Sequence, residues 1–304
     1  MRVAMAGSTG LIGSHLAERL RSRGDEVVSL VRPVTDADGI GWDPAAGHVD
    51  AAALEGFDAV VNLAGRSIGA HRWNDEEKLV VWESRVNTTR LLAEAIASLD
   101  RRPSVLVNAS AVGYYGDRGD APLTEDDGPG DGFLPELCVA WERATEPAAE
   151  AGIRVANLRS GIVLSDDGGA LGRLLAPLGP RWISPFRWGL GGKVGDGTQV
   201  WSWISLEDEV RAILHVLDSD LSGAVNLTAP NPVTNAEFTK ALGRVLHRPT
   251  FMWIPRWVVR LFLGSELADI LVLESQRALP ERLLEGGFEF LHDTVDEGLR
   301  AELA

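Results

Sequence analysis

Cysteine, metal-ligand spacing and clustered positive charge are what this 304-residue sequence has least of. Its one cysteine, Cys138, excludes an internal disulfide and a cysteine-ligated zinc cluster, and the six histidines show no ligand spacing. We therefore expect no metal site. The net charge of −15 and the pI near 4.8 disfavour nucleic acid as a partner, because phosphate binding needs clustered lysine and arginine.

Long apolar runs are missing as well. No stretch is long and apolar enough to cross a bilayer, and the chain starts in a strand-like run without a leader pattern. We expect a cytoplasmic protein that binds a small-molecule substrate and no membrane. The hydrophobic content of 45% supports a large core, divided over one big domain or two moderate ones. Nothing in the sequence indicates an oligomeric state.

The most informative stretch is the first turn of the chain. An apolar run over residues 3–6 predicts a buried parallel strand, and apolar residues at helical spacing follow from residue 11. The glycines between them are spaced G-x-x-G-x-x-G, which is typical of a turn that holds a dinucleotide pyrophosphate at a helix N-terminus. A tight strand-to-helix turn without a ligand is the plainer alternative. The residues predicted to bind the cofactor here are Gly7, Ser8, Thr9, Gly10, Leu11, Ile12 and Gly13.

The second predicted strand, residues 26–31, ends at Arg32. In dinucleotide folds the end of this strand reaches the adenosine ribose, where an acid binds the 2′-hydroxyl and an arginine suits a 2′-phosphate. The arginine favours NADP(H) over NAD(H) as the cofactor. The alternative is a solvated arginine at the end of a strand.

Strands and helices then alternate. Residues 33–50 read as a loop or short hairpin, 78–99 as one helix or two, and 134–151 as helical. Buried strands are predicted over 57–65, 104–110 and 153–164. This alternation predicts an α/β fold with a doubly wound parallel sheet of the Rossmann type. Two strand ends supply further cofactor-binding candidates, namely Leu63, Ala64 and Gly65 after the third strand and Arg159 in the fifth.

The pattern changes after residue 165. Residues 177–197 are rich in Gly, Pro and aromatic residues, which suits a pocket-lining insertion, and 224–227 predicts a last strand that rejoins the sheet. We predict a dinucleotide-binding domain from 1–165 plus 200–228. A smaller, mainly helical C-terminal substrate domain would comprise 166–199 plus 229–304. Its predicted apolar cluster is Trp253, Trp257, Val258, Leu261, Phe262 and Leu263.

Several motifs in order make the chain similar to a known family. The glycine turn, Asn62-Leu63-Ala64-Gly65, Ser110, Tyr115-Gly116 and Gly195-Asp196-Gly197-x-Gln199 resemble an extended short-chain dehydrogenase/reductase of the sugar-nucleotide epimerase type. The tail, with Trp253-Ile254-Pro255, Gln276-Arg277 and Leu279-Pro280, resembles the epimerase-like subfamily that carries a C-terminal domain of unknown function. The resemblance covers essentially the whole chain and implies a Rossmann fold and an NAD(P) cofactor.

Two departures from the family pattern concern the chemistry. The family's Tyr-x-x-x-Lys pair is replaced by Cys138 and Glu142, and we expect a neutral thiol that acts as a small apolar residue. Trp201 stands where sugar-nucleotide enzymes carry an arginine for the diphosphate. A less charged or aromatic ligand is one interpretation of the nearby aromatic residues, and core packing is the other. These residues are Trp182, Phe186, Trp188, Trp201 and Trp203.

Two functions follow from these observations. In the first, the chain is an NADP(H)-dependent oxidoreductase or epimerase in which Ser110 binds the substrate carbonyl and Tyr114 or Tyr115 supplies the phenol for proton transfer. In the second, it is a sensor or interaction protein that kept the cofactor and lost the reaction, because a fold alone does not establish activity.

Overall fold

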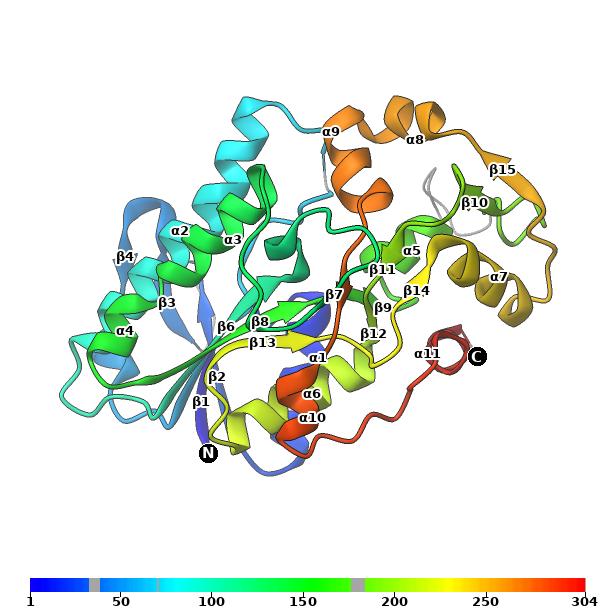
Figure 1. Ribbon diagram of the computed structural model, residues 1–304. Coiled ribbons are helices and arrows are strands. Elements are labelled where there is room, and N and C mark those ends of the chain that lie inside the picture. The colour runs from blue at the N-terminus through cyan, green and yellow to red at the C-terminus, as the bar shows by residue number, and fades with distance from the viewer. Residues whose placement is uncertain (33–38, 70, 176–183, 304) are drawn as a thin grey trace. The chain divides into compact units, whose positions relative to one another are not determined.

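The computed structural model describes residues 1–32, 39–69, 71–175 and 184–303 (Figure 1). The chain forms two compact units. The first unit comprises Met1–Ala111, Glu136–Arg159 and Val210–Val225, and the second comprises Val112–Pro135, Ser160–Glu209 and Asn226–Ala304. The predicted dinucleotide-binding domain covers the first unit and also 112–135, 160–165, 200–209 and 226–228, which cluster with the second. The roles assigned to the two predicted domains stay predictions.

An eight-stranded sheet forms the centre of the first unit, in the order β13-β8-β6-β5-β1-β2-β3-β4. The β1–β2, β1–β5, β5–β6 and β2–β3 pairs are parallel, and β3–β4 is an antiparallel hairpin. The strand order runs outward on both sides of β1, which confirms the doubly wound parallel sheet and the rejoining last strand. The strands are β1 (Arg2–Ala6), β2 (Glu26–Val31), β3 (Ile40–Asp43), β4 (His48–Val49), β5 (Ala59–Asn62), β6 (Val105–Ala111), β8 (Arg154–Ser160) and β13 (Gly223–Leu227).

Helices cover both faces of this sheet, with α2, α3 and α4 on one and α1 and α6 on the other (Figure 1). Leu92 and Ile96 of α2 are fully buried in a core shared with Val60 and Leu106 of the strands. Packing of this apolar stripe makes residues 75–97 a single helix. The helices are α1 (Leu11–Ser22), α2 (Asp75–Ala97), α3 (Phe133–Arg143), α4 (Glu146–Glu150) and α6 (Leu206–Asp218), with short 3₁₀ turns at η1 (Pro44–Ala46) and η2 (Ala52–Leu54).

The predicted fifth strand, 153–164, is wrong as a single element. It divides at Gly161 into β8 and β9 (Ile162–Leu164), and β9 pairs with β12 (Trp203–Ser205) in a separate two-stranded sheet. A Cβ on Gly161 would lie 2.6 Å from the Ser202 carbonyl oxygen. The close backbone approach that glycine permits therefore separates the two strands.

The second unit is built from short strand pairs and helices, and its core holds Trp203, Phe238, Leu242 and Leu299. The pairs are β10 (Gly192–Val194) with β15 (Met252–Ile254), β11 (Val200–Trp201) with β14 (Val233–Thr234), and β16 (Arg277–Ala278) with β7 (Pro122–Leu123). The helices are η3 (Val112–Tyr115), α5 (Gly169–Leu175), α7 (Asn235–Val245), α8 (Arg256–Leu263), α9 (Ser265–Ala268), η4 (Asp269–Leu273), α10 (Glu281–Glu285) and α11 (Val295–Leu303). The helical C-terminal portion is confirmed.

The predicted apolar cluster of the C-terminal region is wrong. Trp253, Trp257 and Phe262 are 62%, 65% and 61% exposed, and α8 has no buried residue. The core of this unit is filled instead by side chains of β12, α7 and α11, so α8 presents its apolar side chains to solvent. No helix within the described ranges is long and apolar enough to span a membrane.

Candidate functional site

The glycine turn after β1 is held by contacts that leave no room for side chains. Gly7 has a φ of +81°, and a Cβ there would lie 2.6 Å from the Leu63 carbonyl carbon. A Cβ on Gly13 would lie 2.1 Å from the Gly7 carbonyl oxygen. The Gly10 amide donates to that same oxygen at 3.0 Å and closes the turn. A positive φ at the first glycine and close helix packing at the third are what a dinucleotide-binding turn requires, and Gly7 and Gly13 meet both requirements.

The turn delivers the N-terminus of α1 to the surface without a cap. Gly10 is the N-cap residue, so no side chain accepts the first amides, and the first turn of α1 carries no acidic residue. Thr9 and Gly10 are exposed, and Ser8, Leu11 and Ile12 are half-buried. Unsatisfied N–H groups and the positive end of the helix dipole suit an anion such as a pyrophosphate.

Arg32 lies directly after β2, the neighbour of β1 in the sheet. Its side chain is exposed, and no carboxylate in the described part of the chain pairs with it. The guanidinium is therefore available for the two charge-assisted hydrogen bonds that a phosphate monoester accepts.

On the other side of β1, the end of β5 adjoins the glycine turn. Leu63 and Ala64 are half-buried and Gly65 is exposed. The Leu63 amide donates to the Ala6 carbonyl at 2.9 Å, which fixes this segment against the end of β1. The structure thus brings together the residues predicted at the glycine turn and at the end of the third strand.

A row of buried asparagines lies beneath this edge, and sequence reasoning missed it. Asn62 Nδ2 donates to Asn108 Oδ1 at 2.8 Å, and Asn108 Nδ2 donates to Asn157 Oδ1 at 3.1 Å. The hydroxyl oxygen of Thr89 accepts a hydrogen bond from Trp141 Nε1 on α3 at 2.9 Å and a second one from Asn62 Nδ2. These bonds tie β5, β6, β8, α2 and α3 together, so the edge is rigid. The signal in the sequence was an asparagine near the end of each of the predicted strands 57–65 and 104–110, and the structure pairs the two directly.

The end of β6 carries a second buried group, which consists of Ser110, Glu142 and Arg159. The Ser110 hydroxyl donates to Glu142 Oε1 at 2.7 Å. Arg159 holds the same carboxylate with two bonds, Nε to Oε1 at 2.8 Å and Nη2 to Oε2 at 2.9 Å. Ser110 and Arg159 are 5% and 3% exposed, and Glu142 is half-buried.

This group changes two of our interpretations. We predicted that Arg159 binds the cofactor, but its guanidinium is hydrogen-bonded to Glu142. The Ser110 hydroxyl donates its proton to the same carboxylate. Glu142 joins them although sequence reasoning gave it no role. The signal was its place one helical turn after Cys138, where the family carries lysine.

Cys138 is 2% exposed, and burial, with Glu142 as the second cause, raises the pKa of its thiol to about 12. The geometry supports the expected neutral thiol. Arg85 of α2 is also buried, and burial lowers the pKa of its guanidinium to about 10, so it is cationic at neutral pH. Its Cζ lies 5.0 Å from the centre of the Trp141 ring, and its Nε has no hydrogen-bond partner among the described residues.

The two tyrosines belong to the second unit. Tyr115 is fully buried, and its hydroxyl lies 2.9 Å from the Thr124 carbonyl oxygen and 2.8 Å from Asn226 Oδ1. The single phenolic proton is thus shared between two acceptors within that unit. Tyr114 is half-buried, with its ring in edge-to-face contact with Tyr115. The geometry favours Tyr114 over Tyr115 as a phenol that could act on a substrate.

Of the five aromatic residues for which the sequence left a ligand or a core role open, the four that the structure describes do not gather into a pocket. Trp203 is fully buried and donates from Nε1 to the Asn231 carbonyl, and Phe186 is 5% exposed in the same core, against which Trp201 packs. Trp188 is 55% exposed, and Trp182 lies outside the described residues. The core-packing interpretation holds for Trp203, Phe186 and Trp201.

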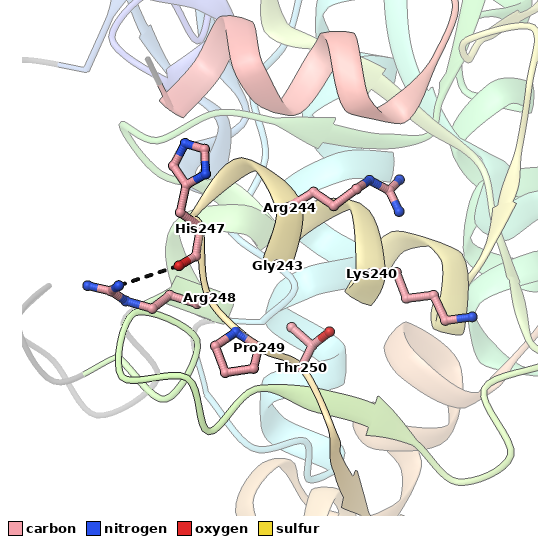
Figure 2. A pocket seen from close by; sticks show the side chains of 7 residues that line it. All are labelled: Lys240, Gly243, Arg244, His247, Arg248, Pro249 and Thr250. Atoms are coloured by element: carbon pink, nitrogen blue, oxygen red, sulfur yellow. Dashed lines mark hydrogen bonds between the residues drawn. The ribbon is translucent and has the colours of Figure 1, made fainter.

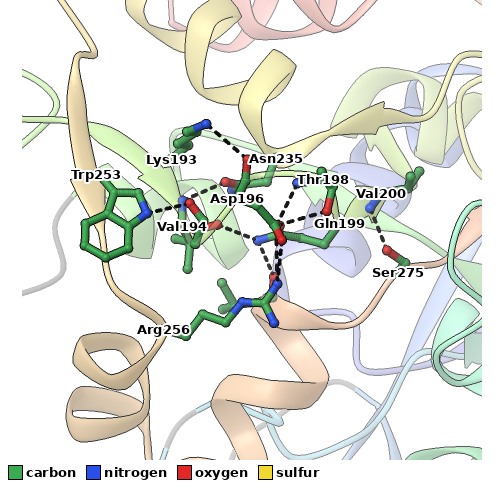
Figure 3. A network of polar contacts seen from close by, with 12 residues as sticks. Lys193, Val194, Asp196, Thr198, Gln199, Val200, Asn235, Trp253, Arg256 and Ser275 are labelled. Carbon is green, nitrogen blue, oxygen red and sulfur yellow. Dashed lines mark hydrogen bonds and ion pairs between the residues drawn. The ribbon is translucent and has the colours of Figure 1, made fainter.

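The Gly-Asp-Gly motif is a structural turn in the second unit (Figure 3). Asp196 Oδ1 accepts from the Thr198 hydroxyl at 2.9 Å, and Arg256 Nη2 pairs with its carboxylate at 3.2 Å. The Gly195 carbonyl accepts from Trp253 Nε1 at 2.7 Å. Gln199 donates to the Val194 and Val272 carbonyls at 3.3 Å. These bonds account for the motif without a ligand.

Two open hollows lie on the second unit. One of about 560 Å³ borders this turn, between Lys193, Trp253 and Trp257. The other, of about 550 Å³, lies at the C-terminal end of α7 between Lys240, Arg244 and Arg248 (Figure 2). Arg244 there is paired with Asp296 and Arg248 donates to the Arg187 carbonyl. Neither hollow is lined by a predicted cofactor-binding or catalytic residue.

The family is settled by comparison with known proteins. The model of the NAD dependent epimerase/dehydratase family matches residues 3–227. The chain belongs to this family. Residues 254–302 match a second model, a domain of unknown function (DUF1731), so the subfamily predicted from the tail is confirmed.

Relatives of this epimerase/dehydratase chain span its whole length. An epimerase family protein of Mycobacterium tuberculosis is 47% identical over 299 residues, 98% of this chain and 96% of that protein. The human epimerase family protein SDR39U1 is 37% identical over 308 residues and covers all of both chains. A crystal structure of human SDR39U1 with NADPH matches with a TM-score of 0.89 over 99% of each chain, at 36% identity.

A more distant solved structure shares the fold. The UDP-glucose 4-epimerase of Thermus thermophilus, crystallised with NAD, has a TM-score of 0.73 at 21% identity. Among the described residues of this chain, no group of three or more His, Cys, Asp or Glu side chains is placed to hold a metal ion.

Proposed function

We propose that this chain binds NADP(H) and exchanges a hydride between that cofactor and a hydroxyl or carbonyl group of a small molecule, as an oxidoreductase or epimerase. One observation supports this cofactor: the uncapped N-terminus of α1 lies behind the glycine turn, and Arg32 at the end of the adjacent strand is exposed, with no carboxylate partner among the residues that the structure describes. The human relative crystallised with NADPH supports the same choice.

The residues present fit this cofactor in defined roles. The backbone amides of residues 8–13 would hold the pyrophosphate, because Gly10 leaves the helix terminus open. Arg32 would bind the 2′-phosphate of the adenosine ribose. Leu63, Ala64 and Gly65 would flank the cofactor at the end of β5, and Ser110 would contact the substrate oxygen at the end of β6. Bound NADP(H) supplies or accepts the hydride.

A second candidate function is an NADP(H)-binding sensor without turnover. Two observations favour it: the thiol of Cys138 stays protonated, and the hydroxyl of Tyr115 is engaged within its own unit. Neither the Cys138 thiol nor the Tyr115 hydroxyl is then available to transfer the substrate proton. The two candidates share the cofactor and differ in whether bound NADPH is oxidised.

Two measurements separate these possibilities. Calorimetric titration with NADPH and NADH tests the cofactor, and we expect NADPH to bind more tightly; equal affinities would contradict the assignment. Single-turnover absorbance at the NADPH band, with 4-nitrobenzaldehyde and 9,10-phenanthrenequinone as carbonyl probes, tests the reaction. Oxidation of bound NADPH supports the oxidoreductase, and a stable NADPH signal with both probes supports the sensor.

A further inference from the structure

We propose that Ser110, Glu142 and Arg159 form the proton relay of this protein, in the place where the family carries its tyrosine and lysine; this rests on the proposed oxidoreductase function. Ser110 is the catalytic residue that contacts the substrate oxygen, Glu142 accepts the proton through Ser110, and Arg159 positions Glu142. All three lie in the first unit.

The direction of the serine hydrogen bond carries the proposal. Because the Ser110 hydroxyl donates to Glu142 at 2.7 Å, its proton points away from the substrate and its lone pairs are left to accept. Ser110 stands near the carboxyl end of β6, two strands from β1 in the sheet, and ligands of open parallel sheets bind at this edge. A substrate hydroxyl that donates to Ser110 completes a chain of two hydrogen bonds ending at a carboxylate.

The contacts of Glu142 fix its carboxyl group beside the Ser110 hydroxyl. Arg159 reaches it from β8 with two parallel bonds, which fix the orientation of the carboxyl group. Cys138, one turn earlier on α3, lies within the electrostatic reach of Glu142, and Arg85 from α2 acts on that same thiol. Arg85 has no carboxylate partner within the described ranges.

The step balances without a further reactant. In oxidation, the substrate O–H bond breaks and its proton passes to Ser110 Oγ, while the proton of Ser110 passes to Glu142 Oε1. The C–H bond of the same carbon breaks with its electron pair, which leaves as the hydride that NADP⁺ takes up. The products are a carbonyl compound, NADPH and a protonated Glu142, which then loses its proton to water. Reduction is the same path reversed.

This resting arrangement assigns a substrate class. Ser110 donates its own proton to Glu142 and leaves its lone pairs to accept, so the arrangement observed is prepared for a hydroxyl-bearing substrate. A carbonyl substrate needs the opposite form, in which Glu142 is protonated and Ser110 donates. We therefore infer that oxidation of a secondary or primary hydroxyl is the first half of the reaction.

The test uses the full chain with NADPH and the two carbonyl probes, because the same relay must work in both directions. We expect Glu142→Gln and Ser110→Ala each to lower the single-turnover rate by about 10²–10⁴-fold, the range for loss of a general acid, without changing NADPH affinity. Glu142→Asp should keep the rate within about tenfold. Added formate should restore part of the rate of Glu142→Ala, which a purely structural role would not allow.

Glu77→Gln is the matched control. Glu77 is also held by two bonds from an arginine, Arg66 Nε at 2.7 Å and Nη2 at 3.0 Å, and it lies on α2, away from the end of β6 that carries Ser110. This variant should leave the rate unchanged. A readout without turnover accompanies the rates: in protein labelled with ¹³C-glutamate, the carboxyl resonance of Glu142 must differ between the wild type and a folded Ser110→Ala variant.

The outcomes separate the two proposals. Suppose that the wild type is active. If Glu142→Gln then keeps both the rate and the NADPH affinity, or if formate does not raise the rate of Glu142→Ala, the relay is wrong and the proposed function stands. An unmoved Glu142 resonance in Ser110→Ala also overturns the relay. A wild type that binds NADPH but oxidises none with either probe overturns the relay together with the oxidoreductase.

Discussion

At the scale of single residues, charge and its partners decide what each side chain can do. Arg32 and Arg159 are both arginines near predicted strand ends. Arg32 is exposed and has no carboxylate partner in the described part of the chain, whereas Arg159 is buried and paired with Glu142. Sequence reasoning assigned both to the cofactor, because it reads residue type and position but not pairing. The pairing depends on α3 and β8 meeting in space, which the spacing of residues 142 and 159 does not reveal.

Arg32→Asp should reverse or abolish the preference for NADPH. The guanidinium can make two charge-assisted bonds to a 2′-phosphate, whereas an aspartate repels it and accepts from a 2′-hydroxyl. We expect a change of about 2–3 kcal/mol in the difference between the two binding free energies. Calorimetry with both nucleotides measures it, and an unchanged preference would move the 2′-phosphate away from this residue.

Cys138 should resist alkylation in the folded protein. Because burial raises the pKa of its thiol to about 12, the thiolate fraction at pH 8 is only ~10⁻⁴, and the thiolate is the reactive form. Reaction with iodoacetamide should be slow up to pH 9 and become fast in guanidinium chloride, as followed by mass spectrometry. Rapid labelling of the native chain would show an exposed, acidic thiol instead.

At the scale of elements, the first strand, its turn and α1 are the part that the sequence predicts best. The contacts of Gly7 and Gly13 are local, so glycine spacing and apolar periodicity suffice to place them. The division at Gly161 and the exposed α8 were missed for the opposite reason. Both depend on distant partners, the Ser202 backbone in one case and a core already filled by α7 and α11 in the other.

Two glycine substitutions should differ sharply in stability. Gly13→Ala places a Cβ 2.1 Å from the Gly7 carbonyl oxygen, whereas Gly10→Ala places one 3.3 Å from the same oxygen. We expect a loss of about 3 kcal/mol in unfolding free energy for Gly13→Ala and less than about 1 kcal/mol for Gly10→Ala. Urea denaturation of both variants gives the values. Similar stabilities would mean that α1 is not packed against the turn as described.

At the scale of the whole molecule, fold and family could be predicted, while the reaction could not. Motifs spread from Gly7 to Gln199 gave the sheet and the cofactor class, because phosphate binding and chain turns impose residue types at fixed spacings. The chemistry rests on Glu142, which the family pattern marks only as a missing lysine. A departure from a motif says which group is absent and does not say what its replacement contacts.

The exposed apolar side chains of α8 invite a test of the expectation that the protein binds no membrane. The chain carries a net charge of −15, and the two arginines of α8 are already paired, Arg256 with Asp196 and Arg260 with Asp269. The cationic contribution that draws such helices to anionic lipid is therefore largely cancelled. We expect no co-sedimentation with phosphatidylserine vesicles at 0.15 M salt, and sedimentation would refute this.

The proposed function requires NADP(H) to bind at the turn between β1 and α1. Calorimetric titration of wild-type protein and Gly10→Val with NADPH, side by side, tests it most directly. The branched side chain stands where the pyrophosphate must approach the backbone, so we predict saturable binding to the wild type and none to the variant, whose far-ultraviolet spectrum stays folded. Wild-type affinity in a folded Gly10→Val protein would contradict the account, because the cofactor would then bind elsewhere.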